Sequence, residues 1–399
     1  MDVESFRALL GGTGLAAVGR ARAALDAGAE PLAVATDVRQ AFPDLPREVA
    51  AAAVTQAKLR RRARAKFGDL ADRMWFTADG VEQATRAEVA AHRAARFAAL
   101  TAALDRPPRV ADLCCGIGAD LHAIVSAGCE VTGFDRDPLT AAVAKANIEA
   151  LHLQATVECL DVEALDRTGF DAAFLDPARR HAGRRTFDVR DYSPPWPYVV
   201  DLLASMPSGV KVGPGIPHHL VPAGVEAEWV SFGGGLKEAV LWSASLATPG
   251  VRRRATVLPG GECLVARGEH VEVKVAAPRR YLYEPDPSVI RAHLVADVAE
   301  RVGGALLDAT TAYVTSDSLV STPFARAFEI SEVMPFSLKR LRQELRARGI
   351  GAVTIMKRGS AVDVEQLRRD LKLSGDQHIV VVLALVAGRR CVLLAQPVT

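Results

Sequence analysis

The sequence predicts an α/β protein in which a mainly parallel, helix-covered sheet follows a helical N-terminal module and precedes a C-terminal α+β domain. Three observations support this prediction. Apolar β-type runs alternate with helical segments between residues 76 and 247, which is typical of a parallel sheet covered on both faces. A glycine-rich turn at Gly116 and Gly118 separates one of these runs from a helix. With 399 residues, 49% of them hydrophobic, the chain is long enough for two or three domains.

The first two regions differ in their hydrophobic pattern. Residues 1–75 are rich in alanine and follow a helical period with breaks at GGTG, AGAEP and FPDLP, which predicts a small helical module. Residues 76–247 contain predicted strands with helices between them, such as PLTAAVAKANIEAL. The predicted strands are RVADLCC, EVTGFD, ATVECLDV, FDAAFLD, GVKVGPG, EAEWVSF and EAVLWSA.

The remaining chain predicts a separate α+β unit. Residues 248–326 form a connecting region that begins with the β-rich ATVLPGGECLVARG and continues into a helix over DPSVIRAHLVADVAERVG. Residues 327–399 form the C-terminal α+β domain. Its predicted elements are the strand FEISEVM, the helix SLKRLRQELRARG, the strand AVTIMKR, the helix DVEQLRRDLK and the hairpin HIVVVLALVAGRRCVLLAQ.

Composition narrows the class of protein. The formal net charge of +2 is not that of a polycation, although arginine is concentrated in KLRRRARAK and ARRHAGRRTFDVR, which could either bind phosphate or simply cover a solvated surface. Acidic residues occur early in MDVESFRALL, and the longest apolar run, IVVVLALVAG, is shorter than the roughly 20 residues of a membrane span. We therefore expect a cytoplasmic protein without a membrane partner. The six cysteines form no CxxC pair, so we expect neither a metal site nor a disulfide framework.

The glycine-rich turn predicts a site for a ligand that contains a ribose. A strand, a glycine turn and a helix bring backbone N–H groups close to a ligand. The next predicted strand ends in Asp135, 17 positions after Gly118, where a carboxylate can accept hydrogen bonds from ribose hydroxyls. Dinucleotide-binding proteins share this arrangement, so it does not by itself choose the cofactor.

Three details favour S-adenosylmethionine over a dinucleotide. Leu121 stands where the dinucleotide fingerprint has its third glycine. Asp112 and Asp120 place two carboxylates beside the turn, which would repel a pyrophosphate but suit a cofactor with a sulfonium and an ammonium group. Asp161 lies at the end of the next predicted strand and could accept a hydrogen bond from an adenine amino group. The fourth strand then ends in FLDPARR, at Asp176, at the edge of the sheet where ligands bind.

Taken together, DLCCGIGAD, GFDRDP, CLDVEAL and LDPARR resemble the motifs of class I S-adenosylmethionine-dependent methyltransferases, which have a Rossmann-like sheet. The resemblance covers roughly residues 76–247. It implies that Asp135 holds the ribose and Asp161 the adenine, and that Asp176 faces the methyl group. The residues that it places in the loop around the methionine moiety are Asp112, Cys114, Gly116 and Gly118.

Two flanking segments resemble parts of nucleic-acid methyltransferases. The segment from Trp75 to Phe97 is similar to the lead-in of enzymes related to the cap-trimethylguanosine methyltransferases, which implies that Thr85 touches the cofactor carboxylate. Residues from about 327 to 397 resemble the THUMP-like domain of bacterial methyltransferases. Because THUMP domains bind RNA, this resemblance implies an RNA partner such as tRNA or rRNA.

The motif that would contact the methyl acceptor departs from the pattern of amine-methylating enzymes, which is Asn or Asp followed by two prolines and an aromatic residue. Asp176 and Pro177 fit this pattern, but Ala178 and Arg179 replace the second proline and the aromatic ring. A base would then stack on Arg179 itself or on an aromatic ring elsewhere. The candidate substrate-binding residues are Arg179, Arg180, Arg184, Arg185, Tyr192 and Trp196. SPPW, 17 residues after Asp176, is interpreted as a proline-stiffened loop.

Purely structural roles are alternatives for several of these residues. Asp112 could cap the following helix, Asp135 could form a turn before Pro138, and Asp161 could start a helix. Asp176 and Pro177 could simply end a strand, and cysteines in the turn could serve only for packing.

The sequence favours an S-adenosylmethionine-dependent methyltransferase that modifies a nitrogen of an RNA base, with Asp176 and Pro177 as catalytic residues. A covalent mechanism is disfavoured because the later cysteines, Cys263 and Cys391, lie in predicted strands of the C-terminal region. The alternatives are a protein or small-molecule methyltransferase on the same fold and a non-catalytic, cofactor-binding RNA-associated factor.

Overall fold

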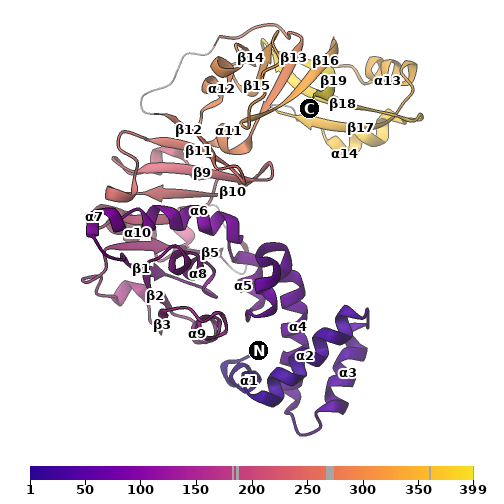
Figure 1. The fold of residues 1–399 in the computed structure, drawn as a ribbon. Coiled ribbons are helices and arrows are strands. Elements are labelled where there is room, and N and C mark those ends of the chain that lie inside the picture. Colours follow the sequence, from indigo (N-terminus) through magenta and orange to yellow (C-terminus); the bar gives the residue numbers. More distant parts are fainter. Residues whose placement is uncertain (182–183, 186–187, 267–273, 359–360, 399) are drawn as a thin grey trace. The chain divides into compact units, whose positions relative to one another are not determined.

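The computed structural model describes residues 1–181, 184–185, 188–266, 274–358 and 361–398, and does not describe the side chains of residues 179–181 and 184–185 (Figure 1). The chain divides into two compact units. Unit 1 comprises residues Met1–Glu226 and Ala239–Thr248, and unit 2 comprises Ala227–Glu238 and Pro249–Thr399.

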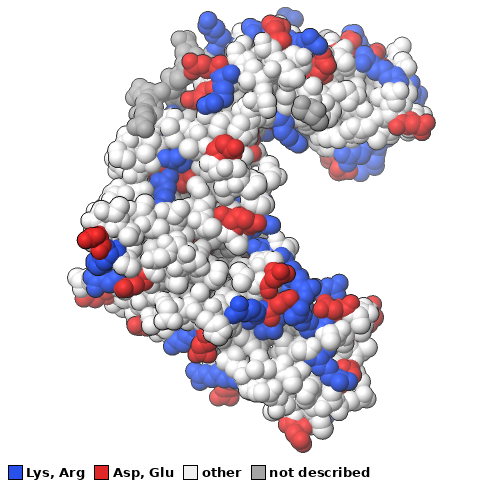
Figure 2. All heavy atoms as spheres, in the orientation of Figure 1, with Lys and Arg blue, Asp and Glu red and all other residues white. Residues whose placement is uncertain are grey.

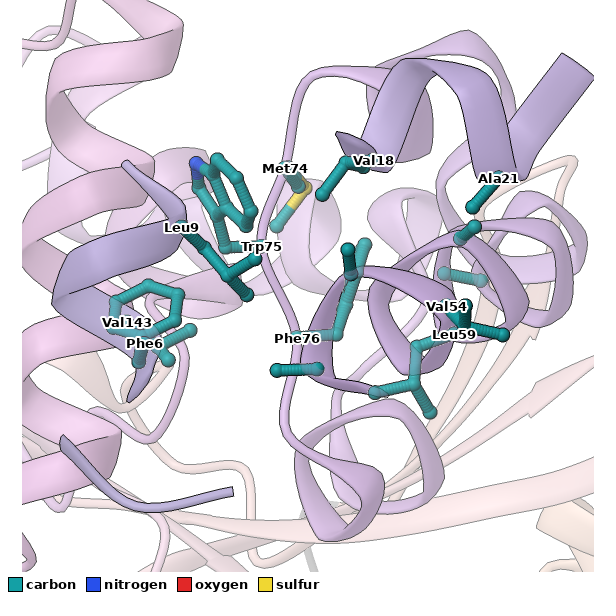
Figure 3. Packing of buried hydrophobic residues seen from close by; sticks show 14 of the residues in the cluster. Phe6, Leu9, Val18, Ala21, Val54, Leu59, Met74, Trp75, Phe76 and Val143 are labelled. Carbon is teal, nitrogen blue, oxygen red and sulfur yellow. The ribbon is translucent and has the colours of Figure 1, made fainter. Parts of the chain in front are cut away.

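Unit 1 begins with the predicted helical module. Its helices are α1 (Val3–Leu9), α2 (Gly12–Asp26), α3 (Pro31–Ala41), α4 (Arg47–Phe67) and the short 3₁₀ helix η1 (Gly68–Asp72). Side chains from these helices enclose Trp75 and Phe76, and Phe6 meets the Trp75 ring edge-on with 5.6 Å between the centroids (Figure 3). The same apolar cluster includes Ile117 of the glycine-rich turn and Val143, so the module shares its core with the sheet region.

A buried asparagine ties this module to the glycine-rich turn. The Asn147 side chain, which is 2% exposed, accepts a hydrogen bond from the Trp75 backbone N–H at 2.6 Å. Its amide nitrogen donates to the carbonyl of Trp75 at 3.0 Å and to that of Ile117 at 2.8 Å. The extended segment after η1 is therefore held against the turn.

The strands of unit 1 have the order expected for a Rossmann-like fold, with one antiparallel strand beside β8. The order β10-β8-β4-β1-β2-β3 is parallel from β8 to β3, and β10 runs antiparallel to β8. Apolar residues of α6 (Ala87–Ala98), including Phe97, pack with Phe174 and Trp242 of the sheet. The strands are β1 (Arg109–Leu113), β2 (Glu130–Asp135), β3 (Ala155–Cys159), β4 (Ala172–Leu175), β8 (Ser208–Val212) and β10 (Gly235–Trp242).

Helices alternate with these strands as the hydrophobic pattern predicts. Asp137 begins one of them by accepting a hydrogen bond from the Thr140 backbone N–H at 2.8 Å, and Pro138 takes the first helical position. The elements are α5 (Ala78–Gln83), α6 (Ala87–Ala98), α7 (Thr101–Leu104), α8 (Ala119–Ser126), α9 (Pro138–Leu151), η2 (Val162–Ala164), η3 (Val189–Asp191), α10 (Trp196–Ser205), η4 (His218–Leu220) and η5 (Ala244–Leu246).

The segment between β4 and α10 differs from the expected loop. Three short strands, β5 (Ala178–His181), β6 (Arg184–Arg185) and β7 (Tyr192–Ser193), form a small antiparallel sheet in the order β6-β5-β7. Arg179 pairs with Tyr192, and Ala178 pairs with Ser193. The interpretation of the SPPW region as a loop was therefore wrong in part, because Ser193 belongs to a strand beside the LDPARR motif.

Unit 2 contains a seven-stranded sheet with the order β14-β15-β13-β16-β19-β18-β17. Side chains of β18 (Gln377–Val386) point alternately into two cores. Ile379, Val381 and Leu383 pack with the helices α13 (Leu338–Ala347) and α14 (Val364–Leu371), while Val380 and Val382 pack on the other face. The predicted hairpin is confirmed as β18 and β19, which pair antiparallel. The predicted helix over residues 286–303 is instead two short helices, α11 (Pro287–Arg291) and α12 (Val295–Arg301), because His293 adopts a left-handed φ of 56° between them.

The elements of unit 2 are β9 (Glu226–Phe232), β11 (Arg253–Leu258), β12 (Glu262–Ala266), β13 (Tyr281–Pro285), α11 (Pro287–Arg291), α12 (Val295–Arg301), β14 (Ala305–Asp308), β15 (Thr311–Ser316), β16 (Ala325–Pro335), α13 (Leu338–Ala347), β17 (Ile350–Lys357), α14 (Val364–Leu371), β18 (Gln377–Val386) and β19 (Arg389–Val398). Within the described residues, no helix is both long and apolar enough to cross a membrane.

Candidate active site

The glycine-rich turn between β1 and α8 passes through three residues with a positive φ. The angle is 60° at Cys114, 57° at Gly116 and 83° at Gly118. Glycine adopts these angles without strain, whereas Cys114 is an unusual non-glycine residue in this region. A Cβ atom added to Gly116 would meet no atom within 4 Å, so the turn is open on that side. The turn therefore presents accessible backbone at the carboxyl edge of the parallel strands, where ligands of open α/β sheets bind.

Asp112, on β1, is a buried carboxylate without a protein partner. Its side chain is 1% exposed, and neither oxygen has a hydrogen-bond partner among the described residues. Burial raises its pKa well above the ordinary value, and the nearby charges of Asp120 and Asp176 add to this effect. Asp112 does not cap α8, because Gly118 occupies that position and no side chain caps the helix. Such a group favours a cationic ligand.

Asp135, at the end of β2, reaches back to the glycine-rich turn. One carboxylate oxygen accepts a hydrogen bond from the Gly116 backbone N–H and the other accepts one from that of Asp137, each at 3.0 Å. Burial raises the pKa of Asp135, while these two hydrogen bonds act in the opposite direction. The carboxylate thus lies between the turn and the start of α9.

Asp161 lies two residues beyond the end of β3. Its side chain is half-exposed, and one oxygen accepts a hydrogen bond from the Glu163 backbone N–H at 3.1 Å at the start of η2. The preceding Leu160 donates its backbone N–H to the carbonyl of Asp135 at 3.1 Å, so the segment lies beside the end of β2. The helix-start role that the sequence left open for Asp161 is present in the structure.

Asp176, directly after β4, lies beside the end of β1. Its backbone N–H donates to the Leu113 carbonyl at 3.2 Å. Its carboxylate oxygen Oδ2 lies 2.5 Å from the Nζ atom of Lys211 on β8, and a quarter of the Asp176 side chain is exposed. The structure therefore brings Asp112 and Asp176 to one edge of the sheet and adds a lysine that the sequence analysis did not single out.

Lys211 belongs to a buried polar network centred on Thr85. The Thr85 hydroxyl accepts hydrogen bonds from Lys211 Nζ at 3.0 Å and Arg93 Nη2 at 3.1 Å, and it donates to Asp120 Oδ2 at 3.3 Å. Arg93 also forms an ion pair with Asp120 and is 2% exposed. The network thus joins the segment before α6 to α8, β8 and the carboxylate after β4.

This network changes the interpretation of two predicted cofactor ligands. A hydroxyl has one donor and two acceptor sites, and the three protein contacts of Thr85 use all of them. The Asp120 carboxylate is already paired with the Arg93 guanidinium, so its charge is compensated within the protein. Of the two carboxylates beside the turn, Asp112 is therefore better placed to bind a cation, because its oxygens have no partner among the described residues.

The sequence does contain a signal for Lys211 and for Arg93, the two residues that the sequence analysis missed. Lys211 is the single charged residue of GVKVG, a strand whose neighbours Val210 and Val212 are fully buried. Arg93 lies on the face of α6 that also carries the buried Val89 and Phe97. A charged residue within an apolar strand or on an apolar helix face indicates a buried ion pair.

The two predicted stacking residues have different environments. Tyr192 is buried, and its hydroxyl accepts a hydrogen bond from the Gly213 backbone N–H at 2.9 Å. Trp196, at the start of α10, is half-buried and meets the Tyr192 ring edge-on, with 6.1 Å between the centroids. Trp196 is therefore the more accessible of the two rings. The side chains of the other predicted substrate-binding residues, Arg179, Arg180, Arg184 and Arg185, lie outside the described part of the structure.

The basic run on α4 is divided between contacts within the protein and an exposed helix face. Arg60 is buried, lies over the Trp75 ring and donates to the Met74 carbonyl at 2.8 Å. Lys66 donates to three carbonyl oxygens at the end of α5, at 2.6 to 2.9 Å. Figure 2 shows positive and negative side chains next to one another over α4 and α5, rather than a uniformly basic surface. We therefore do not assign this run to a ligand.

Arg93→Met is expected to lower the free energy of unfolding by about 3–5 kcal/mol, because it would leave the Asp120 carboxylate buried without its cation. Urea denaturation measures this change. Arg62→Met is the matched control, since the Arg62 side chain is 58% exposed and lies 3.7 Å from Glu82. A loss for Arg93→Met no larger than that of the control would contradict the buried network.

Comparisons with known proteins agree with this geometry. Residues 110–186 match the methyltransferase domain family, residues 325–397 match the family described as THUMP domain-like, and residues 2–63 match a domain of unknown function. Two proteins of Mycobacterium tuberculosis, from strains CDC 1551 and H37Rv, are named as uncharacterized S-adenosylmethionine-dependent methyltransferases. Each is 38% identical over 339 residues, which cover 83% of this chain and 91% of the relative.

The chain belongs to the S-adenosylmethionine-dependent methyltransferases. A crystal structure from Porphyromonas gingivalis W83, which carries the name of a methyltransferase, has the same fold. Its TM-score is 0.73 at 22% identity, over 89% of this methyltransferase and 92% of that chain. The predicted family, fold class and cofactor are thereby confirmed.

The residues at the turn fit S-adenosylmethionine. The unpartnered Asp112 carboxylate of the methyltransferase suits the ammonium group of the cofactor, and the open side of Gly116 leaves room for a ligand against the backbone. The described residues include no group of three or more His, Cys, Asp or Glu side chains that could hold a metal ion.

Proposed function

We propose that this methyltransferase modifies a nitrogen atom of an RNA base. The observation that carries the proposal is the position of Asp176 and Pro177, at the end of β4 and beside the glycine-rich turn. The Asp176 Oδ2 atom is held by Lys211, and no hydrogen bond to Oδ1 occurs in the described structure. A carboxylate oxygen at this edge of the sheet can accept a hydrogen bond from an N–H group of the acceptor.

The protein residues have separate roles in this proposal. When bound, S-adenosylmethionine supplies an activated methyl group on its sulfonium. Asp112 binds the ammonium group, the backbone at Gly116 and Gly118 lines the methionine moiety, and Asp135 accepts hydrogen bonds from the ribose. Asp161 accepts a hydrogen bond from the adenine in this proposal. Asp176 orients the acceptor nitrogen and stabilises the positive charge that develops on it.

Cys114 contributes through the shape of the turn rather than as a nucleophile. It is partly buried, and burial raises the pKa of its thiol above the ordinary value. A raised pKa keeps the thiol protonated near neutral pH, whereas a nucleophilic cysteine needs the thiolate. Direct transfer, without a covalent enzyme intermediate, is therefore the mechanism that we propose.

Two features support RNA as the acceptor. Residues 325–397 match the THUMP domain-like family, and the resemblance to THUMP domains points to RNA binding. The arginine-rich segment that follows Asp176 leads through β5 and β6 and contains Arg179, Arg180, Arg184 and Arg185. Arginine binds phosphate through two parallel hydrogen bonds, and its guanidinium plane also stacks on bases. Trp196 offers a half-buried ring near the same segment for stacking on a base that is unpaired or flipped out.

Changing Arg184 and Arg185 together to alanine is expected to weaken RNA binding and to reduce its salt dependence. The slope of log K against log salt is negative, and each lost phosphate contact reduces its magnitude by about 0.7 to 0.9. Filter binding of RNA at several salt concentrations measures the slope. Arg62→Ala together with Lys58→Ala, on the exposed face of α4, is the charge-matched control. An unchanged slope for the Arg184 and Arg185 variant would assign these two residues to the solvated surface.

A further inference from the structure

The amino-acid end of the cofactor brings a negative charge into a group of carboxylates. Its ammonium and carboxylate groups are attached to the same carbon atom, so an ammonium bound by Asp112 places the carboxylate nearby. Asp176 lies close enough for its charge to raise the pKa of Asp112. A cofactor carboxylate at this place would be repelled by both aspartates unless a cation compensated its charge.

Two buried cations lie in this part of the structure. The Arg93 guanidinium is paired with Asp120, donates to Thr85 and lies over the Phe174 ring at 4.9 Å. Lys211 is 5% exposed, and its ammonium group has two described partners, Thr85 and Asp176. An ammonium carries three N–H donors, so one donor of Lys211 remains for a further acceptor.

Thr85 cannot take the cofactor carboxylate without losing an existing contact. Its hydroxyl proton is donated to Asp120, and its two acceptor sites face cationic donors. A carboxylate can only accept hydrogen bonds, so it requires a donor that is still available. Lys211, which is held next to Thr85, provides this donor together with a positive charge.

We propose that Lys211 binds the carboxylate of S-adenosylmethionine while it holds Asp176, so that one ammonium group links the cofactor to the residue that faces the methyl acceptor. Lys211, rather than Thr85, then contacts the cofactor carboxylate. Thr85 is a positioning residue that holds the Lys211 ammonium group in place. This inference deepens the proposed function but rests only on the cofactor and not on the identity of the acceptor.

The test compares two ligands that differ only in the carboxylate. S-adenosylmethionine and its decarboxylated form both carry the sulfonium and an ammonium group. Calorimetric titration of the full-length protein with each ligand gives the ratio of the two affinities. In the wild-type protein S-adenosylmethionine is expected to bind at least about 10-fold more tightly, as for a charge-assisted hydrogen bond.

Lys211→Met, which keeps the length of the side chain but removes the charge, is expected to reduce this ratio about 10-fold or more. Lys211→Arg, which keeps the charge, should retain most of the preference for S-adenosylmethionine over its decarboxylated form. Lys145→Met, on the exposed face of α9, is the matched control and should leave the ratio unchanged. Because the readout is a ratio of affinities, a variant that merely weakens the whole site does not reproduce the expected result.

Lys211→Met leaves Asp176 without its cation, and this could impair folding. The double variant Lys211→Met/Asp176→Asn removes both charges of the pair and should show the same reduced ratio. An unchanged ratio in either folded variant overturns the proposal, as does a wild-type protein that binds the two ligands equally. No RNA enters this experiment, so its outcome is independent of whether RNA is the acceptor.

Discussion

Asp176→Asn is expected to lower the rate of methyl transfer to RNA by about 10²-fold or more, while the affinity for S-adenosylmethionine changes by no more than a few-fold. The carboxylate of Asp176 would accept a hydrogen bond from the acceptor nitrogen and stabilise the positive charge that develops there. An amide can still accept the hydrogen bond, but it supplies no negative charge. Single-turnover transfer at saturating cofactor and calorimetric titration measure the two quantities.

Asp176→Ala extends this prediction, because it should abolish transfer by removing both the charge and the hydrogen-bond acceptor. The alanine variant also leaves Lys211 buried without its carboxylate partner, and a loss of stability is expected in addition. Asp176→Asn keeps the shape of the side chain and is therefore the control that separates loss of the charge from loss of the side chain in Asp176→Ala. A loss of cofactor affinity that matched the loss of transfer would instead place Asp176 in the cofactor site.

Asp112→Asn is expected to weaken the binding of S-adenosylmethionine about 10- to 100-fold, because a buried carboxylate would lose its contact with the cofactor ammonium. The same change should raise the melting temperature of the cofactor-free protein, since it removes a carboxylate that is buried without a partner. Differential scanning calorimetry and ligand titration test both effects. A variant with lower stability and unchanged affinity would contradict this role.

The affinity for the cofactor should also depend on pH in a defined direction. The pKa of Asp112 is raised above its ordinary value of 3.8, by burial first and then by Asp120, Asp176 and Asp135, while Arg93 lowers it. Below this raised pKa the carboxyl group is protonated and cannot pair with an ammonium, so the affinity should fall as the pH decreases through it. Cofactor binding should release protons in that range.

The stability of the cofactor-free protein should follow the opposite trend for this residue. A carboxyl group whose pKa is higher in the folded than in the unfolded state binds more protons when folded, so its contribution to stability declines as the pH rises from 3.8 to the raised pKa. The Asp112→Asn variant should therefore exceed the wild type in stability by the largest amount at pH values above the raised pKa of Asp112. The difference should be smallest at pH values below 3.8. An equal gain at all pH values would contradict the raised pKa.

The fold of unit 1 could be predicted from the sequence because its signals are local. The strand that precedes the glycine-rich turn is apolar, and the turn itself needs residues with positive φ at Gly116 and Gly118. Asp137 and Pro138 mark the start of α9 by capping and by a fixed φ. Such signals depend on neighbouring residues alone.

The contacts of the candidate site depended on pairing between distant segments and could not be predicted. Lys211 and Asp176 are 35 positions apart, and Thr85 and Lys211 are 126 apart. The pairing of Arg179 with Tyr192 likewise joins two segments that are not neighbours in the sequence. It makes part of the expected loop a small sheet. Hydrophobic periodicity gives no information about which buried charges meet.

The central claim is tested most directly by incubating the protein with S-adenosylmethionine labelled in its methyl group and with RNA from cells in which the gene has been deleted. After digestion of the RNA to nucleosides, the label is expected to elute with a nucleoside methylated on a base nitrogen, and Asp176→Asn is expected to nearly eliminate it. Label in protein, in a ribose-methylated nucleoside or in neither macromolecule would contradict the account.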